Sequence, residues 1–176
     1  MKKHKIRTAA GIAGVAAVLV IGLALRPPLW CYTNFTLRPN VLPTRLIRSA
    51  IRFASGHAAP AIMDDAQGII HGGRDPAVFV RFRTDDDGLQ YVLQEFGGAA
   101  AAVEVLDMEV FRSVRSGWPV FVLVMGWQEK LGVHIYDPST IRSARILTHR
   151  SDFGPRYYLL IDEEQHTVYL LAWPHM

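Results

Sequence analysis

The feature that most constrains this chain is an uncharged run near its N-terminus, TAAGIAGVAAVLVIGLAL, which spans Thr8–Leu25. A run of about 18 apolar residues is long enough to cross the hydrocarbon core of a bilayer as a helix. Arg26 ends the run, and the prolines Pro27 and Pro28 cannot continue a helix. A buried helix of a soluble protein is the alternative, but it would need a polar face that this run lacks. The sequence therefore predicts a transmembrane helix.

This segment could be retained as an anchor or removed as a secretory signal. A signal peptide usually has an apolar core of about 7–15 residues, which is shorter than this run. The small residues Gly22 and Ala24 leave cleavage open as the alternative. Trp30 precedes Cys31 and is too bulky for a lipoprotein cleavage site. We therefore expect an uncleaved signal-anchor that crosses the membrane once.

The basic residues that flank the run predict its orientation. Four of them lie within residues 1–7, whereas Arg26 and Arg38 are the nearest ones after the run. Because basic flanks stay in the cytoplasm, the N-terminus is expected there and the C-terminal domain on the extracytoplasmic side of the cell membrane. The inverted topology is the alternative, in which arginines of residues 45–52 would contact an anionic cytoplasmic leaflet.

Charge is divided unevenly along the chain, and this limits the class of partner. Residues 1–61 contain 9 of the 19 Lys and Arg residues and no acid, whereas all 16 acids lie in 62–176. The C-terminal part therefore has a balance of about −6, the reverse of the basic patch typical of a nucleic-acid-binding domain. The partners we expect are the lipid bilayer, through the N-terminal helix, and another envelope protein, with no nucleic acid.

The chain divides into a basic tail with the transmembrane anchor, 1–26, a connecting segment, 27–60, and an extracytoplasmic domain, 61–176. Prolines in the connecting segment are typical of an extended stalk. Its last part, Thr44–Gly56, predicts a short basic helix with apolar residues on one side. This amphipathic helix packs on the domain in the interpretation we favour. It lies on the membrane surface in the alternative.

Hydrophobic patterns in the C-terminal domain predict an α+β fold, a mostly antiparallel sheet with one or two packed helices. Pro76–Phe82 alternates as a strand does, with a partner in Gln67–Gly73. Apolar residues in Leu89–Phe96 recur at helical spacing. Arg156–Trp173 predicts a terminal hairpin around a polar loop. Further strands are expected at Trp118–Trp127, Gly132–Pro138 and Arg142–His149, and Val103–Ser116 fits either a helix or a strand.

Three consecutive aspartates, Asp85, Asp86 and Asp87, precede the predicted helix and resemble a site. A calcium loop needs acidic or amide side chains at alternate positions, whereas adjacent residues of an extended chain point to opposite sides. Helix capping needs acceptors at this position, and the helix dipole favours negative charge in the first turn. We therefore expect a helix cap, with metal binding or catalysis as the alternatives.

His71 and His134 are the other candidates for chemistry, together with the acids Asp64, Asp65 and Asp75. His71 precedes two glycines, as in the loops of some oxyanion holes, but the chain has no G-x-S-x-G nucleophile. The chain has no P-loop, no Rossmann glycine fingerprint and a single cysteine, which disfavours a thiolate zinc site. We assign no catalytic, cofactor-binding or metal-ligating residue and expect no cofactor.

Two stretches, Asp65–Phe96 and Tyr157–Trp173, resemble small bacterial single-pass membrane proteins of unknown function. In that type an anchor is followed by a strand, an acid-capped helix and a terminal hairpin. The resemblance implies a bacterial envelope protein and no active site. The function we expect is a membrane-anchored domain that binds or scaffolds another envelope component. An anchored hydrolase or metal-dependent enzyme that uses His71, Asp75 or His134 is the alternative.

Overall fold

The computed structural model describes residues 38–72, 76–98, 102–113, 117, 119–149 and 156–173. All of them belong to one compact unit, Thr36–Met176. The predicted transmembrane run, Thr8–Leu25, lies outside the described residues, as does Asp75. Within the described ranges no helix is both long and apolar enough to cross a membrane.

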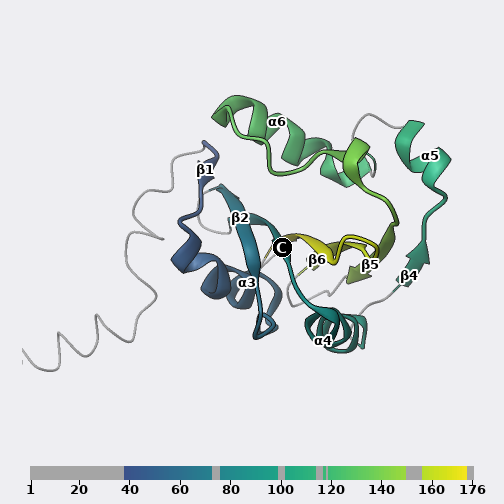
Figure 1. Cartoon of the computed structure of the whole chain (residues 1–176). Helices are drawn as coiled ribbons and strands as arrows, with labels where there is room; N and C mark the ends of the chain where they lie inside the picture. Colours follow the sequence, from purple (N-terminus) through teal and green to yellow (C-terminus); the bar gives the residue numbers. More distant parts are fainter. Residues whose placement is uncertain are drawn as a thin grey trace, which may run out of the picture. The chain divides into compact units, whose positions relative to one another are not determined.

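One antiparallel sheet of seven strands forms the middle layer of the unit, in the order β1-β2-β3-β7-β6-β5-β4 (Figure 1). Every neighbouring pair is antiparallel, which confirms the predicted α+β class with an antiparallel sheet. The predicted terminal hairpin is present as β6 and β7. The strands are β1 Asn40–Val41, β2 Asp64–His71, β3 Ala77–Arg83, β4 Ala102–Val105, β5 Arg145–His149, β6 Arg156–Asp162 and β7 Thr167–Trp173.

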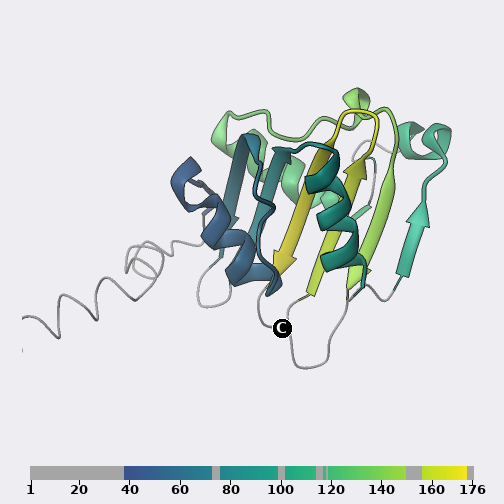
Figure 2. The same ribbon diagram turned by 60° about the horizontal axis from the view of Figure 1, so that its bottom comes forward.

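Helices cover both faces of the sheet, so the unit has three layers (Figures 1 and 2). On one face lie α3, Ile47–Ser55, and α4, Asp86–Gly97. On the other face lie α5, Met108–Ser113, and α6, Val122–Leu131. The sequence predicted one or two helices, fewer than the four described. Short 3₁₀ helices occupy Thr44–Leu46 (η1), Pro119–Phe121 (η2) and Pro138–Thr140 (η3).

The central strands bury side chains on both faces, which explains why their apolar residues do not simply alternate with polar ones. Val80 of β3 packs in the core under α3 and α4, whereas its neighbour Phe79 packs in the core under α5 and α6. In β7, Leu170 packs in the core under α3 and α4, and Leu171 packs in the core under α5 and α6. A sheet that is covered on both faces requires such continuous apolar strands.

The predicted basic helix is present as η1 and α3, and its apolar side packs on the sheet. Ile47, Ile51 and Ala54 are buried in the core that this helix shares with α4. The helix ends at Gly56, whose positive φ of 78° suits glycine. Arg48 donates hydrogen bonds of 2.6 Å to the carbonyl oxygens of residues 60 and 61, which fixes the segment after the helix.

The aspartate run begins α4, as the sequence predicts. The Asp85 carboxylate accepts a 2.8 Å hydrogen bond from the backbone N–H of Gly88, and its own backbone is extended. Asp86 and Asp87 occupy the first turn, where the helix dipole favours negative charge. Asp86 also lies 3.2 Å from the His166 imidazole in the β6–β7 turn. Asp85 is therefore the helix cap, and Asp86 and Asp87 add negative charge to the first turn.

Replacing Asp85 with alanine is expected to lower the free energy of unfolding by about 0.5–2 kcal/mol, because an N–H of the first turn loses its acceptor. Urea denaturation measures the change. Asp87→Ala is the matched control, since Asp87 is exposed and caps no N–H. A loss equal to that of the control, or a dependence of stability on divalent cations, would contradict the capping role.

Two predicted strands are wrong. Trp118–Trp127 contains η2 and the start of α6, and Gly132–Pro138 forms no strand. In the first stretch, the buried residues Val124, Trp127 and Gln128 recur at helical spacing and face the sheet. Their burial as a helix overrides the strand propensity of the valines. The ambiguous stretch Val103–Ser116 divides into the end of β4 and all of α5.

Candidate functional site

A half-open groove of about 740 Å³ lies along α6. One wall is a side of α6 that carries Val122, Met125 and Gly126, and the other wall is the segment 133–138. The positions on α6 are spaced i, i+3 and i+4, so they form a stripe that differs from the stripe facing the sheet. Helix α6 therefore presents apolar atoms to the groove as well as to the core, with Val122 exposed and Met125 partly buried against the core.

A buried glutamine, Gln128, holds the second wall of the groove in place. Its side-chain NH₂ donates a 2.8 Å hydrogen bond to the Tyr136 carbonyl, and its side-chain oxygen accepts from the Tyr136 N–H at 3.0 Å and the Ile135 N–H at 3.3 Å. These are the bonds that a neighbouring strand would make to this extended segment. One side chain thus replaces a strand partner, which explains why the predicted strand at Gly132–Pro138 is absent.

The groove combines an apolar lining with acidic side chains. Glu129 and Asp137 both line it and are exposed. Asp137 accepts hydrogen bonds from the Ser139 N–H at 2.9 Å and its hydroxyl at 2.7 Å. Among the described residues, Glu129 forms no ion pair. The groove therefore suits an apolar ligand that carries positive charge.

The structure separates most of the predicted site residues. His134 lines the groove, whereas His71 stacks on Trp127 with ring centroids 4.9 Å apart and is not among the lining residues. Asp65 forms a 2.7 Å ion pair with Arg81 on the neighbouring strand. Over the ranges that the structure describes, no three His, Cys, Asp or Glu residues are grouped to hold a metal ion. Because Asp75 lies outside those ranges, its convergence with the histidines stays a prediction.

Sequence reasoning missed a cluster of aromatic and ionisable groups around the buried Tyr157. The Tyr157 hydroxyl donates a 3.0 Å hydrogen bond to the Phe96 carbonyl and lies 3.5 Å from the His57 Nε2 atom. The His149 ring stacks on the Tyr157 ring at 4.9 Å, and His57 Nδ1 is 3.9 Å from the Glu95 carboxylate. Burial raises the pKa of Tyr157 to about 12, so this phenol stays protonated.

The protonation of His57 is expected to make stability depend on pH. Burial lowers the pKa of His57 below its ordinary value of 6.5; Glu95 opposes this and His149 adds to it. The unfolded state therefore binds more protons than the folded state just below pH 6.5. The free energy of unfolding should fall as the pH drops from 6.5 through the lower pKa of folded His57.

Titration of the imidazole signals by NMR measures this pKa directly. Glu95→Gln should lower the pKa of His57 further, because the Glu95 carboxylate favours the imidazolium. A His57 pKa at or above 6.5 in the folded protein would contradict the role of burial.

Comparison with known proteins finds no match for this chain among protein-family models, curated proteins or solved structures.

Proposed function

We propose that this protein is a single-pass membrane protein of a bacterial envelope whose extracytoplasmic domain binds a second envelope protein through the groove beside α6. The second apolar stripe of α6 is the observation that carries the binding role. Val122 in this stripe is 60% exposed, whereas Val124, two positions further along α6, is fully buried. An exposed apolar helix face beside a groove is typical of a binding surface. The uncharged run Thr8–Leu25 supports the anchor.

The occupant that fits the groove is an apolar peptide segment of the partner with a basic side chain. Its apolar part would cover Val122 and Met125, and its positive charge would lie near Glu129 and Asp137. Complementary charge at the rim of such a site sets specificity and the rate of association more than affinity. The same rim disfavours an acidic segment, because like charges would meet there.

Filling the groove tests the binding role. A Cβ atom added at Gly126 would meet no atom within 4 Å, so a larger side chain fits the fold and occupies the groove. The full chain in detergent or nanodiscs would be titrated with fluorescent apolar peptides that carry one lysine. Gly126→Leu is expected to weaken binding about tenfold or more, because the site loses its volume.

Gln94→Leu is the matched control, since it adds a similar side chain at an exposed position of α4, on the other face of the sheet. Binding that is unchanged in Gly126→Leu, or lost equally in Gln94→Leu, would refute the groove as the binding site. The anchor has an independent test, because the full chain should float with vesicles after alkaline extraction. A C-terminal reporter should be active on the extracytoplasmic side only.

A further inference from the structure

The exposed side of α3 combines basic and aromatic side chains. Arg45 of η1 and Arg52 of α3 are seven positions apart and are both exposed, with the exposed Ser49 between them. Phe53 lies beside Arg52 and is 41% exposed. Because the apolar side of α3 is buried against the sheet, its arginines and Phe53 are the groups that it presents to an external surface.

The positive charge on this side of α3 has no partner within the part of the chain that the structure describes. Neither Arg45 nor Arg52 forms an ion pair, and no acid occurs anywhere in residues 27–61. Arg48 uses its guanidinium to hold two carbonyl oxygens, but it keeps its charge. Residues 62–176 have a formal balance of about −6, so this surface has the opposite sign to that part of the chain.

We propose that the exposed side of η1 and α3, defined by Arg45 of η1 and by Ser49, Arg52 and Phe53 of α3, rests on the anionic headgroups of the membrane that anchors the protein. This inference rests on the proposed anchor. Because α3 follows the run Thr8–Leu25 by only about 20 residues, the anchor keeps α3 at a high effective concentration near the lipid. Each arginine near an anionic surface then adds to the attraction.

The two surfaces of the domain are compatible in this arrangement. Helices α3 and α6 cover opposite faces of the sheet (Figure 1). Contact of α3 with lipid headgroups therefore leaves the groove beside α6 open to a partner. The basic surface faces the membrane, and the acidic groove faces away from it.

A spin label on α3 tests the contact. The full chain with Cys31→Ser and Ser49→Cys would be labelled and placed in nanodiscs of phosphatidylcholine, with or without phosphatidylglycerol. Collision with a water-soluble paramagnetic quencher reports exposure of the label. We expect protection only in the nanodiscs that contain phosphatidylglycerol, with loss of protection in high salt. A label at Lys130→Cys on α6 should stay accessible in both.

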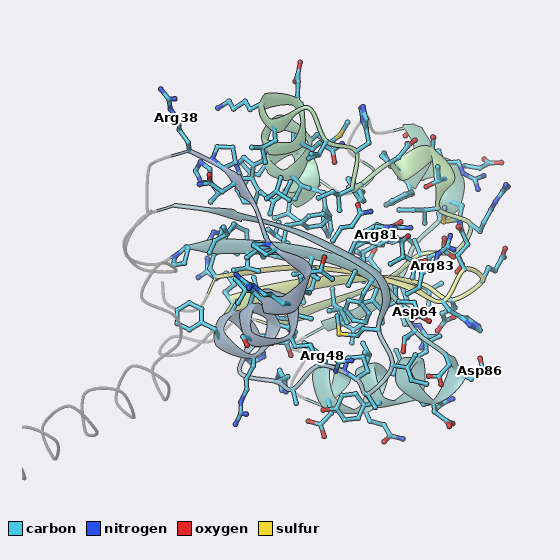
Figure 3. The ribbon with its side chains drawn as sticks, turned by 60° about the vertical axis from the view of Figure 1, so that its left-hand side comes forward. Arg38, Arg48, Asp64, Arg81, Arg83 and Asp86 are labelled. Carbon is cyan, nitrogen blue, oxygen red and sulfur yellow. The ribbon has the colours of Figure 1, made fainter. Side chains whose placement is uncertain are left out.

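Variants that remove arginines test whether the contact depends on this surface or on the total positive charge of the protein. In Arg45→Gln/Arg52→Gln, the ratio of protected to accessible label should fall about fivefold for each arginine removed. Arg83→Gln/Arg142→Gln is the matched control. Figure 3 shows Arg83 near Asp64 at the far end of the sheet from Arg38, and the β2–β3 register pairs Arg83 with Asp64. Circular dichroism would verify that both variants fold.

Each outcome decides a different claim. A label at position 49 that is equally accessible in both lipid compositions would overturn the α3 contact and leave the anchor intact. Equal loss of protection in the control variant would also overturn it. A full chain that does not enter nanodiscs would refute the anchor instead.

Discussion

Replacing Asp162 with alanine is expected to lower the free energy of unfolding by about 3–5 kcal/mol, because several buried donors lose one charged acceptor. Asp162 ends β6 and is completely buried. Its carboxylate accepts the backbone N–H groups of Arg142 and Ser143 at 2.7 and 3.1 Å, and the Ser143 hydroxyl at 3.0 Å. It also accepts the backbone N–H and side-chain NH₂ of Gln165 at 3.3 and 3.0 Å.

These five hydrogen bonds join the loop ahead of β5 to the turn between β6 and β7. Urea denaturation of Asp162→Ala measures the loss, with Glu164→Ala as the control at an exposed acid of the same turn. The loss of stability in Asp162→Asn should lie between those of Asp162→Ala and Glu164→Ala, since asparagine keeps the shape of the side chain and loses its charge. A loss below about 1 kcal/mol in the alanine variant would show that the loop holds without this carboxylate.

Gln128→Leu is expected to cost about 2–4 kcal/mol, although leucine has nearly the same size, because buried backbone groups lose their hydrogen bonds to the Gln128 amide. These groups are the Tyr136 N–H and C=O and the Ile135 N–H. The segment they belong to forms one wall of the groove. The variant should therefore lose peptide binding together with stability.

The comparison variant for Gln128→Leu is Gln94→Leu, at an exposed site on α4. Thermal unfolding followed by circular dichroism, with peptide titration of the folded fraction, separates the two effects. A stable Gln128→Leu variant that still binds peptide normally would contradict the role of this amide in holding the groove.

The sequence predicted elements whose signals are local. Helix α4 has an aspartate cap and apolar residues on one side, and the hairpin β6–β7 has two apolar runs around a polar turn. The sequence predicts a strand where α6 begins because residues 122–125 are all apolar, so their spacing favours no period. This segment is a helix because of a long-range requirement: the second face of the sheet needs a helix to cover it.

The candidate site depends even more on distant contacts. In the Tyr157 cluster, on the face of the sheet opposite α6, His57 and Tyr157 meet although they are 100 positions apart, and no spacing rule brings them together. Gln128 bonds to the segment that follows its own helix. The sequence does not predict these hydrogen bonds, because it suggests that a partner strand makes them. His134 was named from the sequence, whereas the acidic rim at Glu129 and Asp137 follows from the fold.

The binding of charged peptides by wild type and Glu129→Lys tests the central claim most directly. Two fluorescent apolar peptides would differ only in one central residue, lysine in one and glutamate in the other. Wild type in nanodiscs should bind the lysine peptide about fivefold more tightly, and Glu129→Lys should reverse this preference. Equal affinities in wild type, or a preference unchanged by the substitution, would contradict a groove that selects a basic apolar segment.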